Sequence, residues 1–361
     1  MPFEIIKPGT HIDFIGKRRV AFAVSAVLLL ASLTAVGVRG VRLGIDFAGG
    51  TELQLRFQAD ARASEGAIRE VAVACGVNDA SVVRYGEPGS GEFLLRFSRV
   101  AESTGEITGC PLSEEQLARV SELDAVRGMA PEVLDAAGVA DRVLFALGNR
   151  IGPAELMRLE YVGPRVGDEL RRDGISSIAI ACLMILLYIA FRFSMRFAPG
   201  AVIALLHDVG ITAGIFVMVG MEFDLRVLAA LLAILGYSLN DTIIIYDRIR
   251  ENMEIRTKRD LVEVLNLSVN QTLSRTVLTS ATTLGAVLCL LIFGGEVIRS
   301  FAMAMAIGIV VGTYSSTFVA APTLLLLETK LGGTDTPRGA GASGSSRGRH
   351  PKQREGSRAK V

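Results

Sequence analysis

Ionisable side chains lie inside long apolar stretches of the sequence, and they are its strongest candidates for chemistry. His207 and Asp208 stand near the middle of the stretch 197–221, about 15 Å from its start at a helical rise of about 1.5 Å per residue. Asp241 lies within the stretch 227–246. If these stretches cross a lipid bilayer, a charged group near the centre costs at least about 2.5–3.5 kcal/mol, so its presence there predicts a function.

The chemistry that these groups favour is reversible protonation. A carboxyl group in a low-dielectric interior is harder to ionise, and a neighbouring guanidinium makes ionisation easier. Arg275 stands directly before the apolar stretch 276–295, so its movement towards or away from Asp241 would switch a proton off or on the carboxylate. Thr279 follows Arg275 on roughly the same helical face. The predicted proton-coupling residues are Asp241, Arg275, Asp208, His207 and Thr279.

Two less active interpretations of the same residues stay open. Asp241 and Arg275 could form a static buried ion pair that fixes the register of two helices. His207 could simply hydrogen-bond a backbone carbonyl, because a buried histidine needs a partner.

Other reaction classes find little support in the sequence. It contains no GxxxxGK[ST] phosphate-binding loop, no HExxH metal site and no CxxC pair. Asp208 and Asp241 could formally serve an intramembrane aspartyl protease, but the residues before Asp241 do not form the Gly-x-Gly-Asp sequence of such a site. We therefore predict no enzymatic activity, no metal site, no cofactor and no nucleic-acid partner.

The composition shows what kind of chain must hold these groups. Half of the 361 residues are hydrophobic, the mean hydropathy is +0.43, and 38 Lys and Arg almost balance 37 Asp and Glu. The charges gather near both ends, between residues 39 and 173, and in one later loop, which excludes an ordinary soluble enzyme and a disordered or fibrous chain. Six stretches are long enough to cross about 30 Å of hydrocarbon, namely Val20–Val38, Gly174–Phe191, Phe197–Met221, Val227–Tyr246, Thr276–Gly295 and Ser300–Leu327.

The distribution of Lys and Arg predicts the topology of these spans. Both residues are frequent in the N-terminal arm, in the loop after the fourth span and in the tail, so we expect both termini in the cytoplasm. The first span should remain as a signal anchor, because its apolar run is too long for a cleaved signal peptide. The expected domains begin with a cytoplasmic arm (1–19), the first span (20–38) and an α+β domain on the opposite side of the membrane (39–173). Five further spans (174–327) with a cytoplasmic loop at 247–275 follow, and a disordered basic tail (328–361) ends the chain.

The domain between the first two spans carries both strand and helix patterns. Residues 51–57 alternate apolar and polar side chains, which predicts a half-buried strand. One helix is expected after an N-cap at Ser64 and another from Ser113. The further expected strands are 81–85, 92–97 and 154–161. The resulting order β-α-β-β-α-β is that of a ferredoxin-like fold.

Two features of this domain are left open by its sequence. Residues 125–150 stand as an insertion without an assigned structure. Cys75 and Cys110 could form a disulfide if the domain lies outside the cytoplasm.

A glycine-rich motif, GIDFAGG, follows the first span at Gly44–Gly50. Four further motifs come after it in the order Val162–Gly167, His207–Val209, Asn240–Thr242 and Ser274–Thr276. Together they resemble the SecF family, membrane subunits of the bacterial Sec protein-export machinery, over about residues 15–328. Phe47 favours SecF over its partner SecD, which has Leu at that place. The residues that match the family motifs are Gly44, Asp46, Phe47, Gly49, Gly50 and Asn240.

The resemblance implies both a fold and a function. It implies a polytopic α-helical membrane protein of the bacterial inner membrane, with a ferredoxin-like α+β periplasmic domain between its first two transmembrane helices. It implies partnership with SecD and the SecYEG channel, contact with membrane lipids and the translocating preprotein, and use of the proton-motive force for export. The family's proton-linked aspartate and its membrane arginine correspond to Asp241 and Arg275, and Thr279 is a further match.

Two other functions stay open at this point. A proton-driven exporter of the resistance-nodulation-division type uses similar intramembrane carboxylates, but such pumps generally have twice as many spans in one chain. A structural scaffold of the translocation channel would need no titratable group at all.

Overall fold

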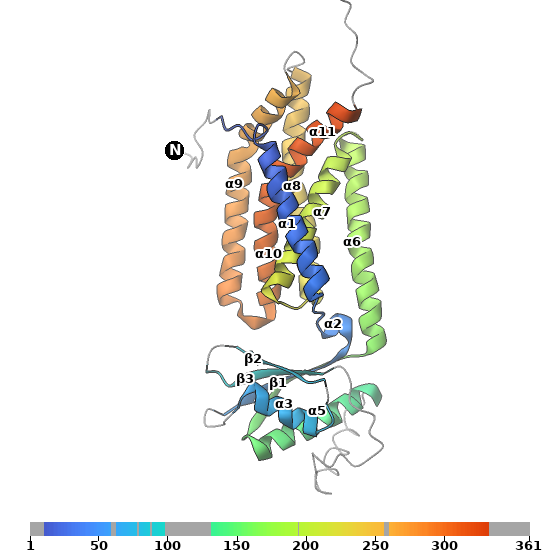
Figure 1. Ribbon diagram of the computed structural model, residues 1–361, viewed down its shortest axis with the longest axis vertical. Coiled ribbons are helices and arrows are strands. Elements are labelled where there is room, and N and C mark those ends of the chain that lie inside the picture. The colour runs from blue at the N-terminus through green and yellow to red at the C-terminus, as the bar shows by residue number, and fades with distance from the viewer. Residues whose placement is uncertain are drawn as a thin grey trace, which may run out of the picture.

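A bundle of long helices with an α+β domain at one end makes up the chain (Figure 1). The computed structural model describes residues 11–58, 63–77, 79–86, 89–97, 131–193, 195–255 and 260–331. Within them, six helical segments are long and apolar enough to cross a membrane, which confirms the predicted number of spans. The first five are α1 (Arg18–Arg39), α6 (Pro164–Arg192), α7 (Ala198–Val219), α8 (Leu225–Ile255) and α9 (Leu261–Phe293).

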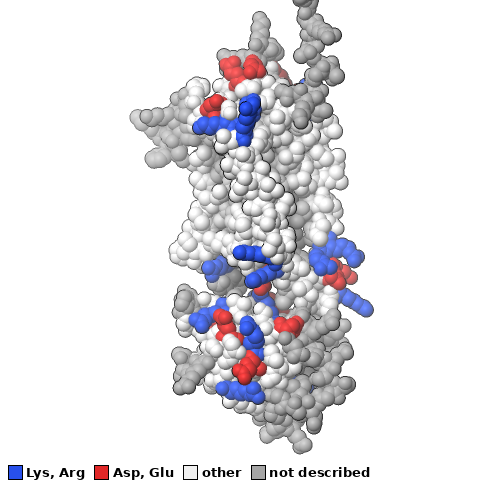
Figure 2. Space-filling model, viewed as in Figure 1, with Lys and Arg blue, Asp and Glu red and all other residues white. Residues whose placement is uncertain are grey.

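The sixth span is a continuous run of three helical segments. They are α10 (Gly295–Ser315), a π-helical turn η1 (Ser316–Ala320) and α11 (Ala321–Leu331). The start of α1 and the end of α11 lie at the end of the bundle opposite to the α+β domain (Figure 1). In the view of Figure 2, charged side chains gather at the top of the bundle and, lower down, where the bundle adjoins the α+β domain and on that domain. An uncharged band of the bundle lies between these two groups. Such a band is what a surface in contact with lipid requires.

The centre of the bundle consists of α7, α8 and the sixth span, whereas few residues in the apolar parts of α1, α6 and α9 are buried. Small residues bring the helices close together. A Cβ atom added to Gly214 of α7 would lie 2.0 Å from the Cβ atom of Ser32 of α1. One added to Gly308 of α10 would lie 2.2 Å from the Cδ1 atom of Ile234 of α8. Close backbone approach of this kind drives helix association in lipid, where water no longer does so.

The α+β domain is a four-stranded antiparallel sheet in the order β2-β3-β1-β4. Its strands are β1 (Gly50–Phe57), β2 (Ser81–Tyr85), β3 (Glu92–Phe97) and β4 (Ala154–Val162), and its described helices are α3 (Glu65–Ala74) and α5 (Pro131–Arg150). Both helices lie on the sheet face that points away from the bundle (Figure 1). This order confirms the predicted ferredoxin-like arrangement.

Alternation along β1 explains how the domain is oriented. Leu53 and Leu55 are fully buried in the core between sheet and helices, and Leu53 pairs with Leu95 of β3. Helix α3 begins where predicted, because the Ser64 hydroxyl accepts a hydrogen bond from the Ala67 amide. The alternate residues of β1 point to the opposite face of the sheet, which is the face towards the membrane helices (Figure 1).

Within the segment 125–150, to which the sequence assigned no structure, residues 131–150 form α5, which packs on the sheet. Val143 and Leu147, one turn apart, are fully buried against it. The expected helix from Ser113 lies outside the described residues, as does Cys110. Cys75 is disulfide-bonded, whereas Cys182 and Cys289 are free.

Several helices continue beyond their apolar parts. Helix α6 already begins at Pro164, and most of the segment predicted as a loop, 247–275, is helical because α8 ends at Ile255 and α9 begins at Leu261. The side-chain amide of Asn252 joins the two extensions by donating to Ser268 Oγ (2.9 Å) and Gln271 Oε1 (2.8 Å). Hydropathy marks the part of a helix in lipid, and such polar contacts extend the helix past it.

Candidate proton-coupling site

Asp241 lies on the buried face of α8, with 2% of its surface exposed. Its Oδ2 atom is buried and has no hydrogen-bond partner. Arg275 on α9 is exposed and makes no ion pair with Asp241. The static buried pair is therefore not the arrangement in this structure, and one oxygen of the Asp241 carboxyl group has no partner.

A cavity of about 320 Å³ lies beyond Asp241 along α8, towards the end of the bundle where α1 begins and α11 ends. It lies between α6, α8 and α9, and Arg192, Asp247 and Arg275 contribute charged groups to its wall. Ile243 and Ile244 of α8, which follow Asp241 by two and three residues, also line it. The cavity thus lies within about one helical turn of Asp241 along α8.

The buried hydroxyl of α9 without a partner belongs to Thr276, one helical turn before the residue that the sequence suggested. Thr279 is the predicted residue, but its Oγ1 donates to the carbonyls of Arg275 and Thr276, both at 3.0 Å, within its own helix. Thr276 is the buried one, and its Oγ1 has no partner. The signal for it was the four-residue spacing of Ser268, Thr272, Thr276 and Ser280, all of which are buried.

The second intramembrane carboxyl group, Asp208 on α7, is fully buried and well supplied with partners. His207 Nδ1 lies 3.0 Å from its Oδ1, and the hydroxyls of Ser238 (2.5 Å) and Ser315 (2.7 Å) donate to its Oδ2. His207 thus contacts a carboxylate, not a backbone carbonyl, and its ring stacks on that of Tyr314 at 6.3 Å. Sequence reasoning missed both serines and Tyr314, because hydroxyl groups are common in membrane helices and carry no distinctive pattern.

The glycine motif forms the joint between α1, the sheet and two membrane helices. Its Ile45–Ala48 part is a single helical turn, α2. Asp46 Oδ2 accepts a hydrogen bond of 3.0 Å from the amide of Leu225, the first residue of α8. Gly49 has φ 72°, and a Cβ atom on Gly167 of α6 would lie only 2.9 Å from the Gly49 nitrogen. The two glycines therefore permit an approach that larger residues would block.

The other motif residues lie on both sides of this joint. The Gly44 amide donates to the Phe223 carbonyl (2.7 Å) just before α8, and Gly50 opens β1 with φ 131°. Phe47 is buried, with 8% of its surface exposed. Asn240 lies apart from this joint, on the exposed face of α8 next to Asp241.

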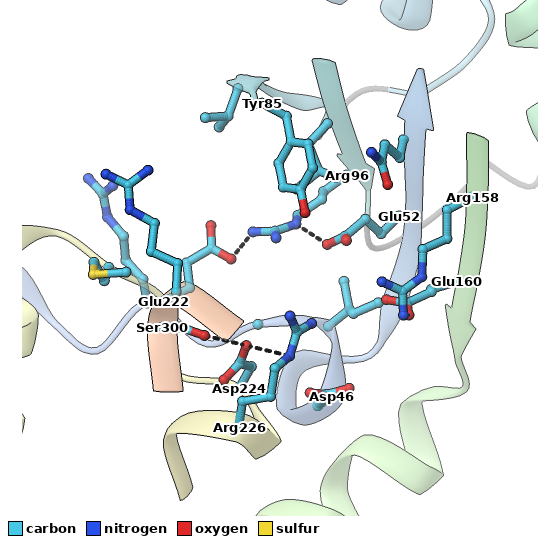
Figure 3. Close-up of a pocket in the computed structure, with 18 of the residues that line it drawn as sticks. Asp46, Glu52, Tyr85, Arg96, Arg158, Glu160, Glu222, Asp224, Arg226 and Ser300 are labelled. Carbon is cyan, nitrogen blue, oxygen red and sulfur yellow. Dashed lines mark hydrogen bonds and ion pairs between the residues drawn. The ribbon is translucent and has the colours of Figure 1, made fainter. Parts of the chain in front are cut away.

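A cleft of about 320 Å³ separates the open face of the sheet from the α7–α8 turn (Figure 3). Arg96 of β3 crosses it and pairs with Glu52 of the sheet and with Glu222 of the turn. Below this bridge, Asp224 pairs with Arg226 and accepts a hydrogen bond from Ser300 (Figure 3). The charged cleft thus links the α+β domain to the start of α8 and α10.

The sequence matches two family descriptions. The one described as protein export membrane protein SecD/SecF, C-terminal, covers residues 146–330, and the SecD/SecF GG motif covers residues 34–61. The protein translocase subunit SecF of Calditerrivibrio nitroreducens is 38% identical, over 90% of this chain and 97% of that one. That of Desulfurispirillum indicum is 42% identical, over 86% and 90%. The chain belongs to the SecF family.

A solved structure extends the SecF likeness to three dimensions. The crystal structure of SecDF, a translocon-associated membrane protein from Thermus thermophilus, is similar with a TM-score of 0.70 and 34% identity. The alignment covers 89% of this chain and 39% of that one, so the SecF-family chain spans about two fifths of the SecDF polypeptide. Asp208, Asp241 and Arg275 fall within the matched segment 146–330, and the joint formed by α2 falls within 34–61.

Proposed function

We propose that this chain is a SecF-type accessory subunit of the Sec protein translocase that uses the proton-motive force to assist preprotein translocation. Family membership supports the translocase role, since relatives over nearly the whole chain carry the name protein translocase subunit SecF. The same membership favours this role over a resistance-nodulation-division exporter. The proposed role is non-enzymatic transport in the bacterial inner membrane.

A SecD-type partner is part of this proposal. The chain spans about two fifths of SecDF, and a partner would supply the remainder. Asn240 and Arg275 support a partner, because both are polar side chains exposed on membrane helices. Exposure of such groups to lipid is costly, whereas contact with another transmembrane helix satisfies them. SecYEG and the preprotein would then bind the complex, and anionic lipid would contact its basic ends.

The proposed orientation follows the excess of Lys and Arg in the N-terminal arm, the loop after the fourth span and the tail of the sequence. Both termini would lie in the cytoplasm, and the α+β domain would lie in the periplasm. The cavity between α6, α8 and α9 would then face the cytoplasm, and the charged cleft of Figure 3 would face the periplasm.

The observation that carries the proton assignment is the buried, unpartnered Oδ2 atom of Asp241. Protonation at this atom would neutralise the group, and loss of the proton would leave a charge that attracts Arg275. Because Arg275 stands apart in this structure, the attraction has room to move α8 and α9 relative to each other. Proton passage would thereby drive a helix movement.

The test replaces Asp241 with asparagine in the full chain, co-expressed with its SecD-type partner. Asp241→Asn keeps the size of the side chain and removes its titration, so gradient-dependent export should be lost while insertion and co-purification persist. Glu254→Gln is the matched control, since Glu254 is an exposed carboxylate on the same helix. Normal export by Asp241→Asn contradicts the proton assignment. Normal export with apolar residues at both Asp241 and Arg275 selects the scaffold function.

A further inference from the structure

The two carboxyl groups inside the membrane have opposite surroundings. Asp241 has a buried oxygen without a donor, whereas three side chains, those of His207, Ser238 and Ser315, contact the oxygens of Asp208. The hydroxyls of Ser238 and Ser315 both donate to Asp208 Oδ2, and His207 Nδ1 lies within hydrogen-bond distance of Oδ1. Side chains of three residues therefore hold the Asp208 carboxyl group in place, whereas Asp241 Oδ2 has no such contact.

The contacts of Asp208 join three helices at one point. Asp208 belongs to α7, Ser238 to α8 and Ser315 to α10, and all three residues have 0–1% of their surface exposed. A fourth helix joins through Tyr314, which stacks on His207 and donates a hydrogen bond of 2.9 Å to the Ala21 carbonyl of α1. We call Asp208, Ser238 and Ser315 the α7 hub.

The hub lies directly beside the site of the exchangeable proton. Ser238 precedes Asp241 by three residues on α8, which is about 4.5 Å along the helix axis and on the same face. On the other side, the π-helical turn η1 begins immediately after Ser315. Turns of this kind inside α-helices occur frequently at functional sites, because they change the rotation of one part of the helix against the other.

We infer that Asp208 is a positioning residue, which fastens α8 to α7 and α10 through Ser238 and Ser315 and so sets the place of Asp241. This inference rests on the proposed function of Asp241. It assigns Asp208 a role different from proton carriage, with which the sequence alone had grouped it. Among the described residues, His207 of α7 contacts Asp208, Tyr314 of α10 stacks on His207, and Arg275 of α9 is exposed and makes no ion pair with Asp241.

The test measures how readily Asp241 is protonated when the hub is weakened. Dicyclohexylcarbodiimide reacts with protonated carboxyl groups in lipid, and mass spectrometry of the modified peptide gives its rate at Asp241 over a range of pH. Ser238→Ala and Ser315→Ala should each change that rate at a fixed pH by at least about threefold. Ser316→Ala is the matched control, because this buried neighbouring hydroxyl donates only to the Thr313 carbonyl of its own helix.

A double-variant comparison separates positioning from proton carriage. If the serine acts through the carboxylate, adding Ser238→Ala to Asp208→Asn should change the rate by less than about twofold, since the two residues form one network. Should Asp208→Asn fail to fold, the two single serine variants decide the matter. Rates within twofold of the unaltered chain in both of them overturn the inference, and so does labelling of Asp208 as fast as that of Asp241.

The outcome also distinguishes this inference from the proposed function. An Asp241 that reacts in a pH-dependent manner in the unaltered chain, together with unchanged rates in both serine variants, overturns the positioning role alone. An Asp241 that never reacts, or normal export by Asp241→Asn, overturns the proton assignment and the positioning role with it.

Discussion

Replacing Gly167 with alanine should loosen the joint between the α+β domain and the bundle. The new Cβ atom would lie 2.9 Å from the Gly49 nitrogen, 3.3 Å from the Phe47 oxygen and 3.4 Å from the Gly49 Cα atom. All three are backbone atoms, so no side chain can rotate away and the segments themselves must separate. Overpacking of this kind typically costs about 1–3 kcal/mol.

The expected loss can be measured on the purified chain in detergent. One kcal/mol lowers a melting midpoint by about 2–4 °C in domains of 150–250 residues, so the Gly167→Ala midpoint should fall by about 2–12 °C. Hydrogen exchange should also rise at the Gly44 amide, which is bonded to the Phe223 carbonyl across the joint. Gly148→Ala in α5 is the control, because its Cβ atom would meet nothing within 4 Å. Equal midpoints for the two variants would refute the packing argument.

Two further predictions concern the same domain. Arg96→Ala removes the side chain that pairs with both Glu52 and Glu222, so hydrogen exchange in the α7–α8 turn should increase while the spans stay protected. Unchanged exchange in that turn would show that these ion pairs do not stabilise it. Leu53→Ala empties a fully buried site in the sheet core and should destabilise the α+β domain by about 2–5 kcal/mol. Limited proteolysis should then cut that domain faster than the bundle, and equal cutting of both would contradict the prediction.

The sequence predicted a helix or strand correctly where apolar residues repeat at a constant spacing and all face the same environment. Six apolar stretches gave six spans, and the alternation of residues 51–57 gave β1 within one residue of its observed start. The sequence did not predict helix α5, whose apolar face is recognisable only once the sheet that it covers is known. Val143 and Leu147 have the correct spacing, but their segment also contains Gly138 and Gly148, which weaken a helix pattern.

The site was predictable in its charges and not in its contacts. Asp208 and Asp241 stood out because carboxyl groups in apolar stretches are rare. Which of them has partners depends on how α7, α8 and α10 are rotated against one another, and the sequence does not fix that rotation. The same reason explains Arg275: its position in the chain suggested a partner for Asp241, yet its side chain lies on the exposed face of α9.

Helix α8 connects the proposed proton site to the α+β domain without an intervening hinge. Asp46 holds its first residue, Leu225, and Asp241 follows about 24 Å further along the same helix. A shift of α8 at Asp241 therefore reaches the joint and the Arg96–Glu222 bridge as a movement of one rigid element. If Asp241 binds the proposed proton and the α+β domain binds a polypeptide, the factor by which the proton changes the polypeptide affinity must equal the factor by which the polypeptide changes the proton affinity.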